Sequence, residues 1–206
     1  MMKRLEALIE WVKGPVIADI GTDHGIVPIE AVKRNRAEKA YACDIAEGPL
    51  ERAEKAIEQT GMTGRVIPVL CDGIEGVPKD ADQFIIAGMG AETIIHILED
   101  GDIGDERLLL SPHSHEELLR RYLSDNGFMI IRERRIADRG HFYPIIDAQR
   151  GGQQLTEAEI LYGYNVVQDE DWAQFVQSET ARLRSLASRV PEKKQEELLK
   201  RLCLLQ

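Results

Sequence analysis

The first half of the chain alternates short apolar runs with glycine turns and helical patterns. Each run is only a few residues long and has an aspartate or a glycine at its end or within two residues of it. A β-branched run that ends in glycine before a helical pattern is typical of the start of a doubly wound α/β domain. The pattern therefore predicts parallel strands whose carboxyl ends meet at one edge of a Rossmann-like sheet. The four runs are Val16–Ile20, Ala40–Asp44, Val66–Leu70 and Phe84–Ala87.

Further elements follow from the spacing of apolar residues. Leu5–Val12 places its apolar side chains on one helical face and predicts an N-terminal helix. Ala91–Leu98 and His115–Leu123 predict two more helices. Phe128–Ile136 and His141–Ala148 predict an antiparallel hairpin at one end of the sheet. We therefore expect seven strands, mostly parallel, with helices on both faces.

The last quarter of the chain has a different pattern. Gln149–Gln154 is the one linker-like stretch, so we expect a domain over residues 1–150 and an extension over residues 151–206. In the extension, apolar residues recur at three- and four-residue steps from Trp172 onward and resume after Pro191. This spacing predicts two antiparallel helices packed as a short coiled coil.

Aspartates stand at the ends of the first three apolar runs. Asp19 and Asp23 frame the first turn, and Asp44 ends the second run. Asp72 follows the third. A nucleoside-type cofactor fits this order, because Asp44 can accept from ribose hydroxyls and Asp72 from an adenine amino group. An ordinary turn, with aspartate as a local hydrogen-bond acceptor, is the competing explanation for the first motif alone.

The first turn favours S-adenosylmethionine over a dinucleotide. The dinucleotide fingerprint needs three closely spaced glycines so that the backbone can approach a pyrophosphate. Here Gly21 and Gly25 have no third partner, and a second carboxylate in the turn would repel a pyrophosphate. S-adenosylmethionine has no phosphate and is cationic at its sulfur and amino group, so carboxylates attract it.

Several motifs extend this pattern across the chain. They are Asp19–Gly25 with Pro28, Asp44 with Gly48–Leu50, Asp72–Gly73, Ile86–Gly90, Ser111–Pro112 and Gly127–Phe128. Together they resemble the bacterial tRNA (adenine-22)-N1-methyltransferase family over essentially the whole chain. The resemblance implies a Rossmann-like class I methyltransferase with a C-terminal helical tail. It also implies methyl transfer from S-adenosylmethionine to N1 of an adenine in tRNA.

The strand ends and the resemblance together give an expected cofactor site. Asp19, Gly21 and Asp23 are expected around the methionine part of the cofactor. Asp44 is expected at the ribose and Asp72 at the adenine. The full expected set is Asp19, Gly21, Asp23, Gly25, Asp44, Ile45, Asp72, Gly73, Ala87 and Gly88.

The expected catalytic residues are Asp23, His24 and Met89. N1 of adenine already carries an in-plane lone pair, so attack on a methyl group requires alignment more than a base. We expect the target adenine at the turn Ile86–Gly90, with backbone carbonyls as acceptors and Met89 as an apolar neighbour. Because N1 lies on the pairing edge, the base must be unpaired or taken out of a helix. His24 is equally compatible with a turn histidine that makes only a structural hydrogen bond.

The chain departs from the family pattern mainly on the expected substrate side. The departures are Ile26, Ala91, Ser111, His113 and Pro144. The resemblance therefore supports cofactor binding more firmly than the RNA target. Two alternatives stay open: a methyltransferase of another target, and an S-adenosylmethionine-binding protein of the same fold without turnover.

The formal net charge of −10 is unusual for a protein that binds RNA, since phosphate contacts supply most non-specific affinity. The acidity is uneven: residues 1–106 carry 11 basic and 21 acidic side chains, whereas residues 107–150 carry 8 and 6. We expect tRNA phosphates to meet the second segment or the helical tail. The candidate phosphate contacts are Arg132, Arg134, Arg135 and Arg139, and a merely solvated face is the alternative.

Composition sets the remaining expectations. The three cysteines form no Cys-x-x-Cys pair, which favours reduced thiols in a cytoplasmic protein. The histidine spacing does not favour a metal site. No apolar run is long enough to cross a bilayer, and no signal segment opens the sequence. We expect a monomer, or a weak dimer formed through the helical tail.

Overall fold

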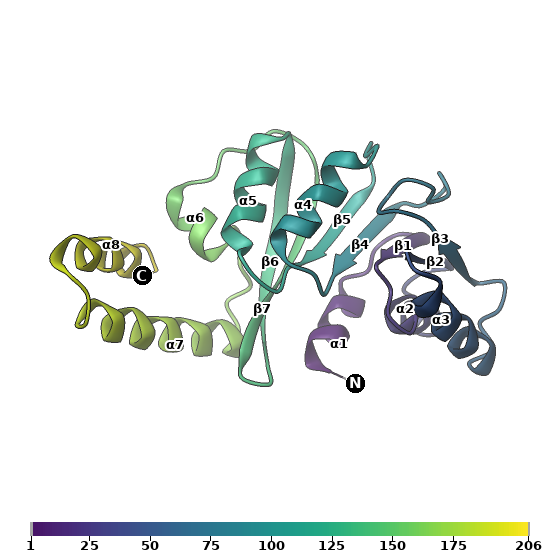
Figure 1. Ribbon diagram of the computed structural model, residues 1–206, viewed down its shortest axis with the longest axis horizontal. Coiled ribbons are helices and arrows are strands. Elements are labelled where there is room, and N and C mark those ends of the chain that lie inside the picture. Colours follow the sequence, from purple (N-terminus) through teal and green to yellow (C-terminus); the bar gives the residue numbers. More distant parts are fainter. Residues whose placement is uncertain (1, 206) are drawn as a thin grey trace.

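The computed structural model describes residues 2–205 and confirms a seven-stranded sheet flanked by helices (Figure 1). The strand order is β3-β2-β1-β4-β5-β7-β6, and β7 alone runs in the direction opposite to that of the other six strands. This matches the predicted mostly parallel sheet with a terminal hairpin. The strands are β1 (Val16–Ile20), β2 (Lys39–Asp44), β3 (Val66–Leu70), β4 (Gln83–Ala87), β5 (Arg107–Ser111), β6 (Phe128–Asp138) and β7 (His141–Arg150).

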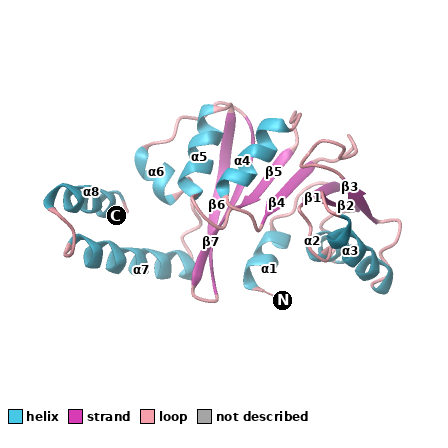
Figure 2. Ribbon diagram, in the orientation of Figure 1, coloured by secondary structure: helices cyan, strands magenta, loops and turns pink. Residues whose placement is uncertain are grey.

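Helices cover both faces of the sheet (Figure 2). The first group is α1 (Lys3–Glu10), α2 (Ile26–Lys33) and α3 (Glu47–Gln59), and the second is α4 (Ala91–Asp100) and α5 (Glu116–Asp125). Successive strand residues point to opposite faces. Ile17 therefore packs in the core under the first group, and Ala18 in the core under the second. Both faces of the central strands are apolar, as expected for a parallel sheet.

Several predicted boundaries shift by one or two residues. The N-terminal helix spans Lys3–Glu10 instead of Leu5–Val12. The amides of Trp11 and Val12 donate to Leu8 and Ile9 carbonyls three residues back, which tightens the chain and ends the α-helix. The strands of the hairpin are each two residues longer than predicted, because pairing continues to the tip and base of the ladder.

The extension contains three helices, so the predicted two-helix tail is incomplete. They are α6 (Glu157–Tyr162), α7 (Glu170–Ala187) and α8 (Glu192–Leu204). Helix α6 begins at a capping box in which Thr156 and Glu159 bond each other's backbone amides. Helices α7 and α8 pack against each other and extend away from the sheet (Figure 1).

A buried ion pair joins this tail to the sheet. Arg120 of α5 and Glu133 of β6 are both buried and lie 3.0 Å apart. Arg120 also donates to the carbonyl of Ile160 in α6, and Glu133 accepts from the amide of Tyr164. The predicted linker is tied down as well, since the Gln153 side chain accepts from the Ile130 amide of β6. The tail is therefore anchored to β6 by polar contacts as well as by packing.

Candidate active site

A cleft of about 250 Å³ lies at the carboxyl edge of the sheet, where β1 and β4 end beside helix α1. We call it the acidic cleft. Its main lining residues are Asp19, Gly21, Asp23, Ala87, Gly88 and His113, with Arg4 and Leu5 from α1. The structure thus brings together five of the expected cofactor residues from two strand ends.

Hydrogen bonds between neighbouring strand ends build this edge. The amides of Gly21 and Thr22 donate to the Cys43 carbonyl at 2.9 and 2.8 Å, which ties the first turn to the end of β2. The Cys71 amide donates to the Asp44 carbonyl at 3.1 Å and ties β3 to the same edge. The carboxylates at the ends of β1, β2 and β3 therefore follow one another along a continuous border.

Asp19 is the buried carboxylate of the acidic cleft. Its residue is 6% exposed, and among residues 2–205 no lysine, arginine or histidine forms an ion pair with it. Burial raises the pKa of Asp19 to about 7; the Thr22 hydroxyl opposes this rise and the Asp44 carboxylate adds to it. A buried carboxylate without a cationic partner is suited to bind a cationic ligand group.

Asp44 and Asp72 lie outside the lining of the acidic cleft but on the same edge. One Asp44 oxygen accepts from the Ala46 amide at 2.9 Å, so its carboxylate is held in place with a second oxygen left for a ligand. Ile45 beside it is 66% exposed and offers an apolar surface for a flat ring. Asp72 and Gly73 follow at the end of β3. This arrangement suits an elongated ligand with a cationic end, a sugar and a base.

The turn after β4 closes the other side of the acidic cleft. The Met89 side chain lies against Gly21, where a Cβ atom would come within 2.0 Å of the Met89 methyl carbon. A side chain at position 21 would displace the Met89 methyl group, and the φ of +74° at this position favours glycine. The Met89 carbonyl accepts from the His113 amide at 2.8 Å. This predicted acceptor for the substrate base is thus already engaged within the protein.

Asp23 and His24 are both exposed in the first turn. Asp23 lines the acidic cleft and bonds Arg52 at 3.2 Å. His24 lies 3.4 Å from the same carboxylate and has a positive φ of 60°, and neither it nor Gly25 lines the cleft. The structure is compatible with a role for Asp23 toward a ligand. For His24 it is more compatible with the structural alternative.

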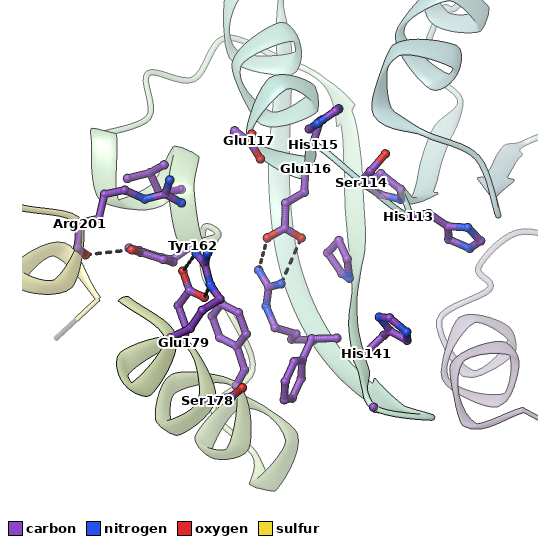
Figure 3. Close-up of a pocket in the computed structure, with 18 residues that line it drawn as sticks. His113, Ser114, His115, Glu116, Glu117, His141, Tyr162, Ser178, Glu179 and Arg201 are labelled. Atoms are coloured by element: carbon purple, nitrogen blue, oxygen red, sulfur yellow. Dashed lines mark hydrogen bonds and ion pairs between the residues drawn. The ribbon is translucent and has the colours of Figure 1, made fainter. Parts of the chain in front are cut away.

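A second cleft, of about 390 Å³, lies between the sheet domain and the tail (Figure 3). We call it the tail cleft. Its centre holds the pair Glu116–Arg135, with contacts of 3.1 and 2.6 Å. Burial alone would raise the pKa of Glu116, but the charges of Arg135 and Arg120 outweigh burial and hold that pKa below its usual range. Glu179 and Arg182 form another pair on α7. The charges at the centre of the tail cleft are therefore neutralised within the protein.

Three of the four arginines predicted to contact phosphates form ion pairs within the fold. Arg132 pairs with Asp147, and Arg134 pairs with Asp169 at 2.8 Å. Arg135 is 3% exposed and pairs with Glu116. Each of these three arginines therefore faces a carboxylate from another element, which balances its charge within the protein. Arg139 differs, because it is exposed at the hairpin tip.

The sequence analysis named His113 only as a departure from the family pattern and gave it no role in the site. His113 follows β5 after Pro112 and lines the acidic cleft, so a search for polar residues just beyond each strand end would have found it. Arg4 and Leu5 reach the cleft because α1 packs across it, and no local pattern gives this placement.

Residues 2–205 contain no group of three or more potential metal ligands. None of the described helices combines the length and the apolar character that crossing a bilayer requires.

Comparison with known proteins agrees with this geometry. A family model described as "Methyltransferase domain" matches residues 1–146. The tRNA (adenine(22)-N(1))-methyltransferase of Bacillus subtilis (strain 168) is 36% identical over 156 residues, which span 73% of this chain and 66%, just under two thirds, of that protein.

Solved structures extend the similarity to the tail. Mycoplasma capricolum TrmK, solved with the cofactor product S-adenosyl-homocysteine, superposes with a TM-score of 0.83 at 28% identity, covering 100% of this chain and 96% of that one. Streptococcus pneumoniae Sp1610 in complex with S-adenosyl-L-methionine gives a TM-score of 0.86 at 30% identity, covering 100% and 98%. The helical tail is thus shared with these proteins, as well as the sheet.

Proposed function

We propose that this chain, which belongs to the family described as "Methyltransferase domain", is a tRNA (adenine(22)-N(1))-methyltransferase that methylates N1 of adenine 22 in tRNA with S-adenosylmethionine as donor. One observation carries the assignment of the cofactor. Asp19, a buried aspartate with no cationic partner among residues 2–205, begins an edge along which further aspartates follow.

The residues present fit this cofactor. Asp19 and Asp23 would hold the cationic methionine part beside Gly21. Asp44 would accept from the ribose hydroxyls and Asp72 from the adenine amino group. The remaining contacts proposed from the sequence are Gly25, Ile45, Gly73, Ala87 and Gly88. When bound, S-adenosylmethionine supplies an electrophilic methyl group.

The protein's own part in the reaction is alignment and exclusion of water. The adenine N1 lone pair needs no base before attack, so the side chains around the site have to orient the base and keep water out. Met89 and Leu5 supply apolar surface at the acidic cleft. Positive charge moves from the cofactor to the base during transfer, and the Asp23 carboxylate would stabilise that charge electrostatically.

Two alternatives have specific support. Most of the five departures from the family pattern lie on the expected substrate side, which favours a different methyl acceptor. The pairing of Arg132, Arg134 and Arg135 within the fold favours a protein that binds the cofactor without RNA turnover. A cytoplasmic location, and a state of monomer or weak tail-mediated dimer, belong to the proposal.

The test uses labelled S-adenosylmethionine with bulk bacterial tRNA, followed by mapping of the modified nucleoside. We expect 1-methyladenosine at position 22 and no product from a matched transcript that carries guanine there. Methylation at another position would establish a different target. Tight cofactor binding without transfer to any tRNA would establish the binding protein.

A further inference from the structure

His113 lies where the two clefts meet. It lines both the acidic cleft and the tail cleft. It follows β5 after Ser111 and Pro112, and its amide donates to Met89, so its backbone is fixed beside the turn after β4. Figure 3 shows its side chain pointing away from the tail helices. A group that reached the cofactor from the tail side would pass this side chain.

His113 belongs to a cluster of three aromatic rings. Its ring centroid lies 5.4 Å from that of Tyr143, which lies 6.1 Å from that of His141. We call these three residues the ring cluster. Arg4 of α1 hydrogen-bonds to His113 Nε2 and lies 4.7 Å from the centre of the Tyr143 ring. One face of Tyr143 is therefore covered by a guanidinium, and both His113 and Arg4 line the acidic cleft.

We propose that the ring cluster forms the binding site of the target adenine, with the His113 ring stacked against the base. This inference rests on the proposed function and adds a substrate-binding residue to it. An enzyme that modifies the pairing edge of a base holds that base outside the helix, stacked on aromatic or apolar side chains. The ring cluster provides such a surface beside the expected position of the cofactor.

The charge state of His113 suits this role. Burial lowers the pKa of His113, and the nearby Arg4 guanidinium lowers it further. The imidazole is therefore neutral at neutral pH. Methylation at N1 leaves a positive charge on the adenine, and a neutral ring stacks on that base without the repulsion that an imidazolium would add.

Three substitutions separate stacking from hydrogen bonding. His113→Ala removes the ring, His113→Asn keeps a polar side chain without an aromatic ring, and His113→Phe keeps a ring without nitrogen atoms. Steady-state methylation of tRNA is measured at saturating S-adenosylmethionine, with cofactor affinity measured by calorimetry. We expect kcat/KM for tRNA to fall about tenfold or more in the Ala and Asn variants, since stacking of a base on an aromatic ring is worth that much. His113→Phe should retain most of the wild-type value, and all three should bind the cofactor normally.

A matched control lies two residues away. His115 is exposed, lines only the tail cleft and has a positive φ of 54° that asparagine tolerates, so His115→Asn should leave kcat/KM unchanged. Unchanged kcat/KM in His113→Ala would overturn the proposal. The proposal would also be overturned if His113→Asn kept the wild-type kcat/KM while His113→Phe lost it. A loss of cofactor affinity large enough to account for the fall in kcat/KM would overturn it as well. If the wild-type protein binds cofactor but methylates no tRNA, the proposed function fails before any variant is compared. The proposed binding site for the adenine then fails with it.

Discussion

The carboxyl edge of the sheet and the region joining the hairpin to the tail hold their charges in opposite states. At the edge, Asp19 is buried and has no cationic partner in the described part of the chain. Between hairpin and tail, Arg120 and Glu133 are equally buried but bond each other. Arg135 is likewise paired with Glu116.

This difference in pairing distinguishes charges that stabilise the fold from charges that can bind a ligand. A paired buried charge resists removal of either partner, because the other would be left without compensation. An unpaired buried carboxylate lowers stability and is more useful to a ligand than to the fold. The comparison therefore predicts that removing a charge from the buried pair lowers stability, whereas removing the charge of Asp19 raises it.

The largest expected effect is at the buried pair. Arg120→Met leaves Glu133 buried without its partner, and we expect a loss of about 3–5 kcal/mol in the free energy of unfolding. For a chain of this size, that loss corresponds to a melting temperature lower by roughly 10 °C. Thermal and denaturant unfolding measure it, and Arg121→Met, at the exposed neighbouring position, is the control. Equal stability of both variants would mean that the pair does not anchor the tail.

At Asp19, removal of the charge should raise the free energy of unfolding of the ligand-free protein instead of lowering it. The folded pKa near 7 lies above that of an unfolded aspartate, so the unfolded chain ionises first as pH rises. Asp19 therefore lowers the stability of the ligand-free protein between pH 4 and 7, by about 4 kcal/mol once ionisation is complete. Asp19→Asn removes this cost, so its stability relative to wild type should be larger at pH 8 than at pH 5. Asp72→Asn, at an exposed carboxylate, should show no such gain.

Asp19→Asn should lower the affinity for the cofactor although it raises stability. Loss of the carboxylate removes a charge-assisted contact to the methionine amino group, so S-adenosylmethionine should bind about 10- to 100-fold more weakly at pH 8. In the wild type, affinity should fall as pH drops below 7, because Asp19 becomes protonated. Calorimetry at several pH values measures both trends. A wild-type affinity that is flat from pH 8 to pH 5.5 would argue against contact with Asp19.

The ribose contact should be next in size. Asp44→Ala leaves the ribose hydroxyls without an ionised acceptor, which we expect to weaken cofactor binding by roughly 1.5–3 kcal/mol. Asp80→Ala is a suitable control, since Asp80 contacts Lys39 at the opposite end of β2. Undiminished affinity in the Asp44 variant would place the ribose elsewhere on the edge.

These two regions also differ in how far the sequence predicts them. The strand ends were predictable because an apolar run, its aspartate and the following turn are local, and parallel strands bring such ends together. The partners of Arg134 were not, since Asp169 lies on the far side of the linker and Glu10 lies in α1. Helix α6 did have a local signal, the Thr156-x-x-Glu159 capping box, but its six residues are too few for a periodic pattern.

The smallest expected effect concerns RNA and tests which arginines are free. A phosphate contact contributes about one unit to the slope of log affinity against log salt concentration. Arg139 is exposed at the hairpin tip with a φ of 51°, so Arg139→Asn removes the charge at a conformation that asparagine tolerates.

We expect this variant to shallow the slope for tRNA by up to about one unit. Arg134→Gln serves as the matched comparison from the same strand pair. It should leave the slope unchanged, because the Arg134 guanidinium is held by Asp169 and Glu10. Filter binding between low and moderate salt measures both slopes. If Arg134→Gln shallows the slope and Arg139→Asn does not, tRNA binding must break the internal pairs, and the distinction between structural and free charges would then fail for this face.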